Sequence, residues 1–248
     1  MNLEHLKGKT LLIVDDEEAL REPLCMEFES LGCKVLEASN GKQAFEIVKR
    51  EKIDAVVSDI RMPGGDGVEL LKNIKEWNSE FPVVMLITGF SDLSREEAFD
   101  MGAESILTKP FDLDQIDAEV SRILTPIRER LKGALSLSSN GATCHRTYRS
   151  IEASGKKGEF SLGRGGMFVA GTTDLPVSSE KVAIHIRFSE GNILSIEGSG
   201  VVRWVRREQV QDLLPGYGIE FESLSDGTRD EVLQIASDLK IRAFIPKT

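Results

Sequence analysis

The chain lacks several features that mark whole classes of protein. None of its apolar runs approaches the roughly 20 residues that a membrane-spanning helix needs, and its first residues are charged, unlike those of a signal peptide. Its three cysteines and three histidines do not have the spacing of a zinc site. An odd number of cysteines favours free thiols in a reducing compartment. These absences predict a cytoplasmic protein without membrane insertion.

Charge is divided unevenly along the chain. The 248 residues include 31 Lys and Arg against 41 Asp and Glu, for a net charge of −10. Residues 1–125 hold 14 basic and 26 acidic residues and the remainder holds 17 and 15, so the two net charges are −12 and +2. This contrast predicts a domain boundary near Thr125-Pro126. Neither half is basic enough to predict DNA binding.

In the first half, short apolar runs alternate with amphipathic patterns. Five strands that alternate with five helices predict an α/β fold with a parallel sheet that is covered on both faces. The expected strands are 10–14, 34–38, 53–58, 82–88 and 105–108, and the expected helices are 19–31, 43–49, 68–77, 94–101 and 113–124.

Five polar side chains stand at the carboxyl ends of these strands: Asp15, Asp16, Asp59, Thr88 and Lys109. In a parallel sheet all such ends meet at one edge. Three carboxylates held close together repel one another unless a cation joins them, and carboxylate oxygens suit Mg²⁺. The metal and Lys109 would neutralise a phosphoryl group, while Thr88 would donate a hydrogen bond to it. The pattern therefore predicts an aspartyl phosphate at Asp59.

With these motifs, residues 9–124 resemble a response-regulator receiver domain. The resemblance rests on Asp15-Asp16, Asp59 with the Met62-Pro63-Gly64 turn and Gly67, Thr88-Gly89, and Lys109-Pro110-Phe111. It implies a flavodoxin-like (βα)5 fold and a switch, rather than a turnover enzyme, that a sensor histidine kinase phosphorylates. It also implies that Asp16, Asp59 and the main-chain carbonyl of Arg61 bind Mg²⁺, that Asp15 acts through water, and that the Lys109-Pro110 bond is cis.

One position departs from the family pattern, and one enzyme class competes with it. Receiver domains usually carry Tyr or Phe three residues before the lysine, where this chain has Ile106, which puts the aromatic part of the switch in question. Haloacid-dehalogenase-type phosphatases also use a strand-end aspartate, but they need a second aspartate two residues later as acid and base. Arg61 and Glu17 stand at that distance after Asp59 and Asp15. The spacing therefore favours the switch.

The second half has the pattern of a β protein. Residues 126–142 predict a helical and polar linker, in which Ile127, Leu131 and Leu135 fit either a homodimer contact or packing on the chain's own domain. Short β-branched or alternating segments then predict a small antiparallel β-barrel with a C-terminal helix over 143–248. The expected strands are 159–162, 167–170, 182–188, 193–205 and 217–221, and the expected helix is 226–241.

Residues 143–242 resemble a PilZ domain through Gly165–Val169, Gly200–Val205 and Gly216–Phe221. The resemblance implies cyclic di-GMP binding through an Arg-x-x-x-Arg segment before the first strand and an Asp/Asn-x-Ser-x-x-Gly segment in the next one. Here both motifs are degenerate. Their positions are His145, Arg146 and Arg149 in the first, and Ser161, Gly163 and Gly166 in the second.

Three polar groups of those motifs are replaced, by His145, Ser161 and Gly163. At about 1–3 kcal/mol for each lost contact, nucleotide binding would weaken a hundredfold or more. We therefore expect the barrel to bind a protein partner. The alternative is a cyclic di-GMP effector in which the barrel is the sensor.

Overall fold

The computed structural model describes residues 3–89, 93–133, 142–172, 175–191 and 193–248. Their contacts divide the chain into two compact units, Met1–Ser94 with Met101–Thr125, and Arg95–Asp100 with Pro126–Thr248. Within the described residues, no helix combines the length and apolar character needed to cross a membrane. Leu135 and the rest of 134–141, part of the predicted linker, lie outside the described residues.

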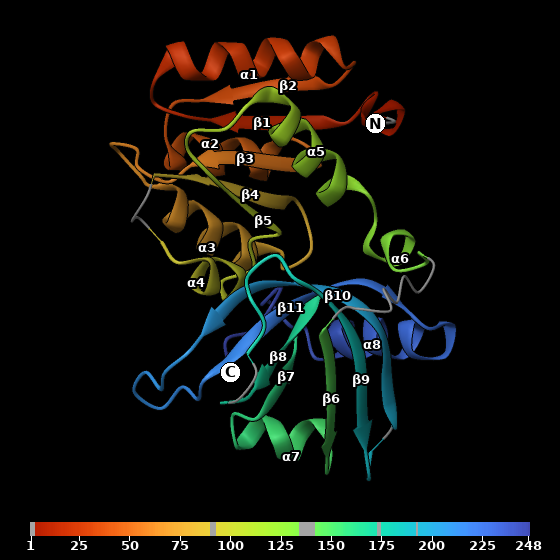
Figure 1. Cartoon of the computed structure of the whole chain (residues 1–248). Helices are drawn as coiled ribbons and strands as arrows, with labels where there is room; N and C mark the ends of the chain where they lie inside the picture. Colours follow the sequence, from red (N-terminus) through yellow and green to blue (C-terminus); the bar gives the residue numbers. More distant parts are fainter. Residues whose placement is uncertain (1–2, 90–92, 134–141, 173–174, 192) are drawn as a thin grey trace. The chain divides into compact units, whose positions relative to one another are not determined.

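The first unit contains a five-stranded parallel sheet, as predicted (Figure 1). The strand order is β2-β1-β3-β4-β5. Buried residues fill β3 and β4 from end to end, which is typical of central strands covered on both faces. The strands are β1 (Thr10–Val14), β2 (Lys34–Ala38), β3 (Ala55–Asp59), β4 (Val83–Thr88) and β5 (Ser105–Thr108).

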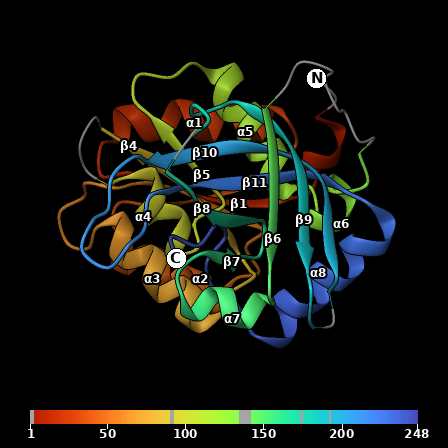
Figure 2. The same ribbon diagram turned by 60° about the horizontal axis from the view of Figure 1, so that its bottom comes forward.

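Helices cover both faces of this sheet (Figures 1 and 2). Apolar side chains of α1 and α5, including Phe28 and Val120, share a buried core with the sheet residues Leu11, Val57 and Met85. A short 3₁₀ helix, η1 (Glu4–Leu6), adds Leu6 to that core. The helices of the first unit are α1 (Glu18–Ser30), α2 (Gly41–Arg50), α3 (Gly67–Trp77) and α5 (Leu113–Leu124). The helix expected at 94–101 forms as α4 (Arg95–Asp100), which the contacts group with the second unit.

Side chains at the helix starts explain why several helices begin where they do. The side chains of Asn40, Asp66 and Asp112 each accept a hydrogen bond from the main-chain N–H three residues later, which caps α2, α3 and α5. At α5 the Gln115 side chain also accepts a bond from the Asp112 N–H, which completes a capping box. The cap at Asp66 matters for function because α3 starts directly after the turn that follows Asp59.

The second unit contains a six-stranded sheet of order β6-β9-β10-β11-β8-β7, curled as a half-barrel. Four of its five strand pairings are antiparallel, but β6 pairs with β9 in parallel, which corrects the expectation of a purely antiparallel barrel. The parallel pairing is possible because a long crossover separates the two strands. The strands are β6 (Ala142–Tyr148), β7 (Phe160–Leu162), β8 (Gly166–Ala170), β9 (Lys181–Phe188), β10 (Ser195–Arg206) and β11 (Gly216–Leu224).

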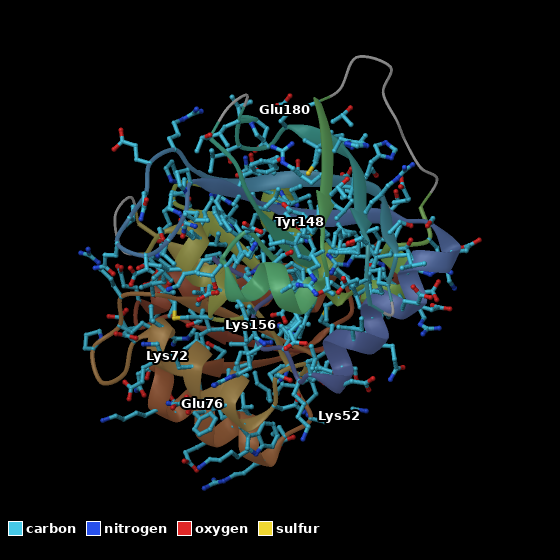
Figure 3. The ribbon with its side chains drawn as sticks, turned by 90° about the horizontal axis from the view of Figure 1, so that it is seen from below. Lys52, Lys72, Glu76, Tyr148, Lys156 and Glu180 are labelled. Carbon is cyan, nitrogen blue, oxygen red and sulfur yellow. The ribbon has the colours of Figure 1, made fainter. Side chains whose placement is uncertain are left out.

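An aromatic cluster links the two edge strands of this sheet. The ring of Tyr148, on β6 (Figure 3), lies 5.3 Å from the ring of Phe160 on β7 and 6.1 Å from that of Phe188 on β9. The Tyr148 hydroxyl donates to the main-chain carbonyl of Glu159 (3.3 Å). Side-chain packing therefore joins the edges of the half-barrel, where the sequence predicted a closed barrel.

The second unit also contains α4 and the helices α6 (Ile127–Arg130), α7 (Ile151–Lys156) and α8 (Asp226–Asp238). Leu131, directly after α6, is fully buried in the core of this unit, and its carbonyl accepts a hydrogen bond from the Leu224 N–H (3.1 Å). The start of the predicted linker is thus part of the second unit. Leu131 is not available for the dimer contact that the sequence left open.

One buried acid in the first unit has no obvious stabilising role. Asp117 on α5 is 7% exposed, and among the described residues its Oδ1 atom has no hydrogen-bond partner. Burial raises the pKa of Asp117 to about 6, and the nearby Glu27 carboxylate adds to the rise. A folded-state pKa above the unfolded value means that the folded state loses stability as pH rises between roughly 4 and 6.

We predict that Asp117→Asn stabilises the protein by about 1–3 kcal/mol at about pH 7.5, because it removes a buried charge. The gain should vanish near pH 4, where the wild-type carboxyl is already neutral. Urea unfolding at both pH values measures this. Asp114→Asn, at an exposed position on the same helix, is the matched control; an equal gain from it would contradict the role of burial.

Candidate functional site

Three of the predicted side chains meet at the carboxyl edge of the parallel sheet. Lys109, which follows β5, places its Nζ atom 2.5 Å from Oδ1 of Asp59 and 3.6 Å from Oδ2 of Asp15. Both acids are buried, at 7% and 4% exposed. One ammonium group therefore holds two buried carboxylates together, which would otherwise repel each other.

The turn after β3 fixes the direction of the Asp59 side chain. The Arg61 main-chain N–H donates to Oδ2 of Asp59 (2.7 Å), while Lys109 binds Oδ1. The Gly67 N–H closes the turn by donating to the Ile60 carbonyl (2.9 Å). A Cβ atom at Gly67 would lie only 2.2 Å from the Asp59 carbonyl oxygen, so the start of α3 can approach β3 this closely only with glycine.

Opposing effects set the protonation of this cluster. Burial raises the pKa of Asp15, and the charges of Asp59 and Asp16 add to the rise, whereas the Glu17 N–H and the Lys109 charge oppose it. For Lys109, burial acts to lower the pKa, but the hydrogen bond and charge of Asp59, together with Asp15, outweigh it and the pKa is raised. Lys109 therefore stays cationic at neutral pH.

Thr88 and the residues around it complete this edge. Thr88 is the last residue of β4 and is buried; its hydroxyl donates to the Gly89 carbonyl (2.7 Å). Its own carbonyl accepts from the Lys109 N–H (2.8 Å), which ties the ends of β4 and β5 together. The Lys109-Pro110 bond is cis, as expected. Ile106 is buried within β5.

The predicted metal ligands only partly converge. Asp15 and Asp59 share the Lys109 ammonium, whereas Asp16 is exposed. Across the ranges that the structure describes, no three His, Cys, Asp or Glu side chains stand ready to ligate a metal together. Two buried carboxylates that already bind one cation are nevertheless a donor set that fits Mg²⁺, and Asp16 lies close enough for its charge to act on Asp15.

The sequence did not reveal one member of the site. The Glu17 main-chain N–H donates to Oδ1 of Asp15 (2.9 Å) and so orients that carboxylate. A main-chain donor leaves no trace in the residue type at its position, so no sequence signal identifies it.

The first of the two predicted cyclic di-GMP motifs lies on and directly after β6, an edge strand of the second sheet. His145 and Arg146 are within β6 and Arg149 directly follows it, which corrects the expectation that this segment precedes the first strand. Arg149 forms an ion pair with Glu190 (3.0 Å), and Arg146 donates to the His145 carbonyl (2.9 Å).

The second motif forms β7, a tight turn and the start of β8. Ser161 is in β7, Gly163 is in the turn and Gly166 begins β8. The main chain of the C-terminal residues runs against this turn, because the Arg164 and Gly165 N–H groups donate to the carbonyls of Ala243 (3.0 Å) and Phe244 (2.9 Å). The chain's own end therefore occupies the turn.

Comparison with known proteins finds relatives of the first unit. The model of the response regulator receiver domain matches residues 11–121. Sporulation initiation phosphotransferase F of Bacillus subtilis is 35% identical over 120 residues, which cover 48% of this chain and 96% of that protein. The chain belongs to the response regulator receiver family. A receiver domain is a phosphorylation-based switch and not a turnover enzyme, as predicted.

Two further relatives show how far the similarity extends. The phosphate regulon transcriptional regulatory protein PhoB of Pseudomonas aeruginosa is 34% identical over 119 residues, 47% of this chain and 52% of that protein. The solved response regulator TrrA of Thermotoga maritima, in complex with Mg(2+)-BeF, is 29% identical and covers 46% of this chain and 98% of that one, with a TM-score of 0.43. The chain thus spans about half the length of PhoB.

We predict that Gly67→Ala destabilises the receiver by about 1–3 kcal/mol, because the new methyl group must push β3 and α3 apart. Urea unfolding measures the loss. Gly227→Ala is the control, since a Cβ atom there meets nothing within 4 Å; it should leave the stability unchanged or raise it by up to about 1 kcal/mol, because alanine favours helix α8 more than glycine does. Equal effects of the two changes would contradict the close approach at Gly67.

Proposed function

We propose that this chain is a two-component response regulator that accepts a phosphoryl group on Asp59 from a sensor histidine kinase in the cytoplasm. In the proposal, residues 1–125 are the receiver, and residues 143–248 are a PilZ-like output domain that binds a protein partner. The observation that carries it is the single Lys109 ammonium held between Asp59 and Asp15 at the carboxyl edge of the sheet.

The geometry of Asp59 suits it to act as the nucleophile. One of its carboxylate oxygens attacks the phosphorus of a phosphohistidine; an O–P bond forms, the P–N bond breaks, and the imidazole nitrogen leaves with the electron pair. The Arg61 N–H and Lys109 restrain the two carboxylate oxygens separately. The positive charge of Lys109 stabilises the negative charge that develops on the transferred group.

Asp15, Asp16, Asp59 and the Arg61 carbonyl would hold Mg²⁺. When bound, the ion supplies further positive charge beside the transferred phosphoryl oxygens. The role of Asp16 requires its side chain to turn in from its exposed position.

Thr88 is the proposed sensor of the phosphoryl group. Its hydroxyl would exchange the Gly89 carbonyl, 2.7 Å away, for a phosphoryl oxygen, which accepts hydrogen bonds more strongly. Lys109 would transfer its contact from the Asp59 carboxylate to the same group. Both changes favour one of two arrangements of the β4 and β5 ends.

The contacts of the second sheet favour a protein partner over cyclic di-GMP. Arg149, one of the two charged positions of the first motif, is paired with Glu190. The turn of the second motif donates its main-chain hydrogen bonds to the chain's own C-terminal residues. The cyclic di-GMP effector remains the alternative function, and a titration decides between the two.

We predict that acetyl phosphate with Mg²⁺ adds one phosphoryl group to the wild-type protein and that Asp59→Asn abolishes the adduct, because the nucleophilic oxygen is lost. Intact-mass spectrometry measures this. Asp114→Asn removes an exposed acid of the same domain and should leave the adduct unchanged. A wild-type protein without an adduct would refute the proposed phosphoacceptor.

We also predict that calorimetric titration with cyclic di-GMP gives no binding heat at micromolar protein, because three polar groups of its motifs are replaced. Arg149→Ala, which breaks the ion pair with Glu190, should leave that result unchanged. Saturable micromolar binding that Arg149→Ala removes would instead establish the cyclic di-GMP effector.

A further inference from the structure

The last residues of the chain fill a slot on the turn between β7 and β8. Phe244 is 2% exposed and Ile245 is fully buried, although neither belongs to a helix or strand. Besides the two main-chain hydrogen bonds from the turn, Nε of Arg164 donates to the Arg242 carbonyl (3.1 Å). Carbonyl groups of this segment thus accept hydrogen bonds from the turn. Its N–H groups at Phe244 and Ile245, where the chain bends, donate to the carbonyl of Phe99 on α4 (2.9 and 3.4 Å).

The slot exists because the turn lacks side chains. A Cβ atom at Gly165 would lie 2.0 Å from the Phe244 ring, and one at Gly163 would lie 2.4 Å from the Phe244 carbonyl oxygen. The φ angle of Gly165 is outside the left-handed region, so the conformation of the turn itself does not require glycine there. Glycine at 165 is explained by the ring that rests on it.

Two guanidinium groups flank the ring. The Cζ atoms of Arg130 and Arg164 lie 5.7 and 5.8 Å from the centroid of the Phe244 ring, within the range of cation–π attraction. Arg130 is held in place by an ion pair with the buried carboxylate of Glu220 (3.0 Å), which also binds Arg203. The slot is therefore a built receptor for an aromatic side chain, with main-chain hydrogen bonds to the segment that carries it.

We propose that this slot is the peptide-docking site of the second unit, and that the C-terminal segment 242–248 is its resident ligand. The proposal rests on the protein-binding output proposed above and specifies it: the partner presents a peptide segment with an aromatic residue and displaces segment 242–248. Main-chain hydrogen bonds give such docking its affinity, and the ring pocket gives its specificity. Because the tail is tethered, its effective concentration is roughly millimolar, so it blocks weaker competitors.

The test is a fluorescence-anisotropy titration of the full-length protein with a labelled peptide of residues 242–248. Wild-type protein should require roughly millimolar peptide, whereas Phe244→Ala, which empties the ring pocket, should bind it at least tenfold more tightly. A peptide with Ala in place of Phe244 should not bind the variant. Equal binding by wild type and Phe244→Ala would overturn the proposal.

A second change tests the slot itself. In the Phe244→Ala background, Gly165→Ala should abolish peptide binding, since its methyl group fills the ring position, while Gly227→Ala should leave binding intact. Peptide binding that survives Gly165→Ala would place the peptide elsewhere and overturn the proposal. If circular dichroism shows that Phe244→Ala does not fold, Phe244→Leu takes its place under the same criteria.

The proposal that Asp59 is the phosphoacceptor is tested separately from the docking site. Acetyl phosphate labelling of the same variants reports on Asp59 alone, and it should be unchanged in all of them. Absence of the label with normal peptide displacement would refute only the phosphoacceptor, and the reverse result would refute only the docking site.

Discussion

The first unit depends on one shared charge. Asp59 and Asp15 are buried close together, and the Lys109 ammonium binds both. Without a cation, two carboxylates in this setting repel each other, and one would have to take up a proton. The cluster brings together the ends of β1, β3 and β5, so any change in charge at Asp59 acts on three strands at once.

Main-chain groups fix the orientation of the carboxylates in this cluster. The Arg61 and Glu17 N–H groups each hold one carboxylate oxygen, and Gly67 lets α3 start within contact of β3. Such donors are fixed by the fold, which means that they need no reorganisation when a phosphoryl group arrives. The second unit uses the same device in another way: glycines in the turn before β8 make room for an aromatic ring.

Much of the receiver could be predicted from the sequence because its central strands β1, β3 and β4 are buried and have continuous apolar sequences. Once the strands were placed, the polar residues at their carboxyl ends could be assigned to one edge of the sheet. The second unit was harder. β6 alternates buried Cys144 with exposed His145. The same residues also match the position of a nucleotide motif that is expected before the first strand. α7 is a single turn and a half rich in small residues, whose only start signal is the Ser150 cap. The parallel pairing of β6 with β9 and the docked tail are long-range contacts, and no local pattern encodes them.

In the proposed reaction, Asp59 is the nucleophile in the cluster around Lys109. Borohydride reduction of the phosphorylated protein converts an aspartyl phosphate to a homoserine residue, which peptide mass spectrometry locates directly. We expect homoserine at position 59 and nowhere else. A phosphorylated protein whose reduced residue lies at another aspartate, or whose phosphoryl group resists reduction on a histidine, would contradict it.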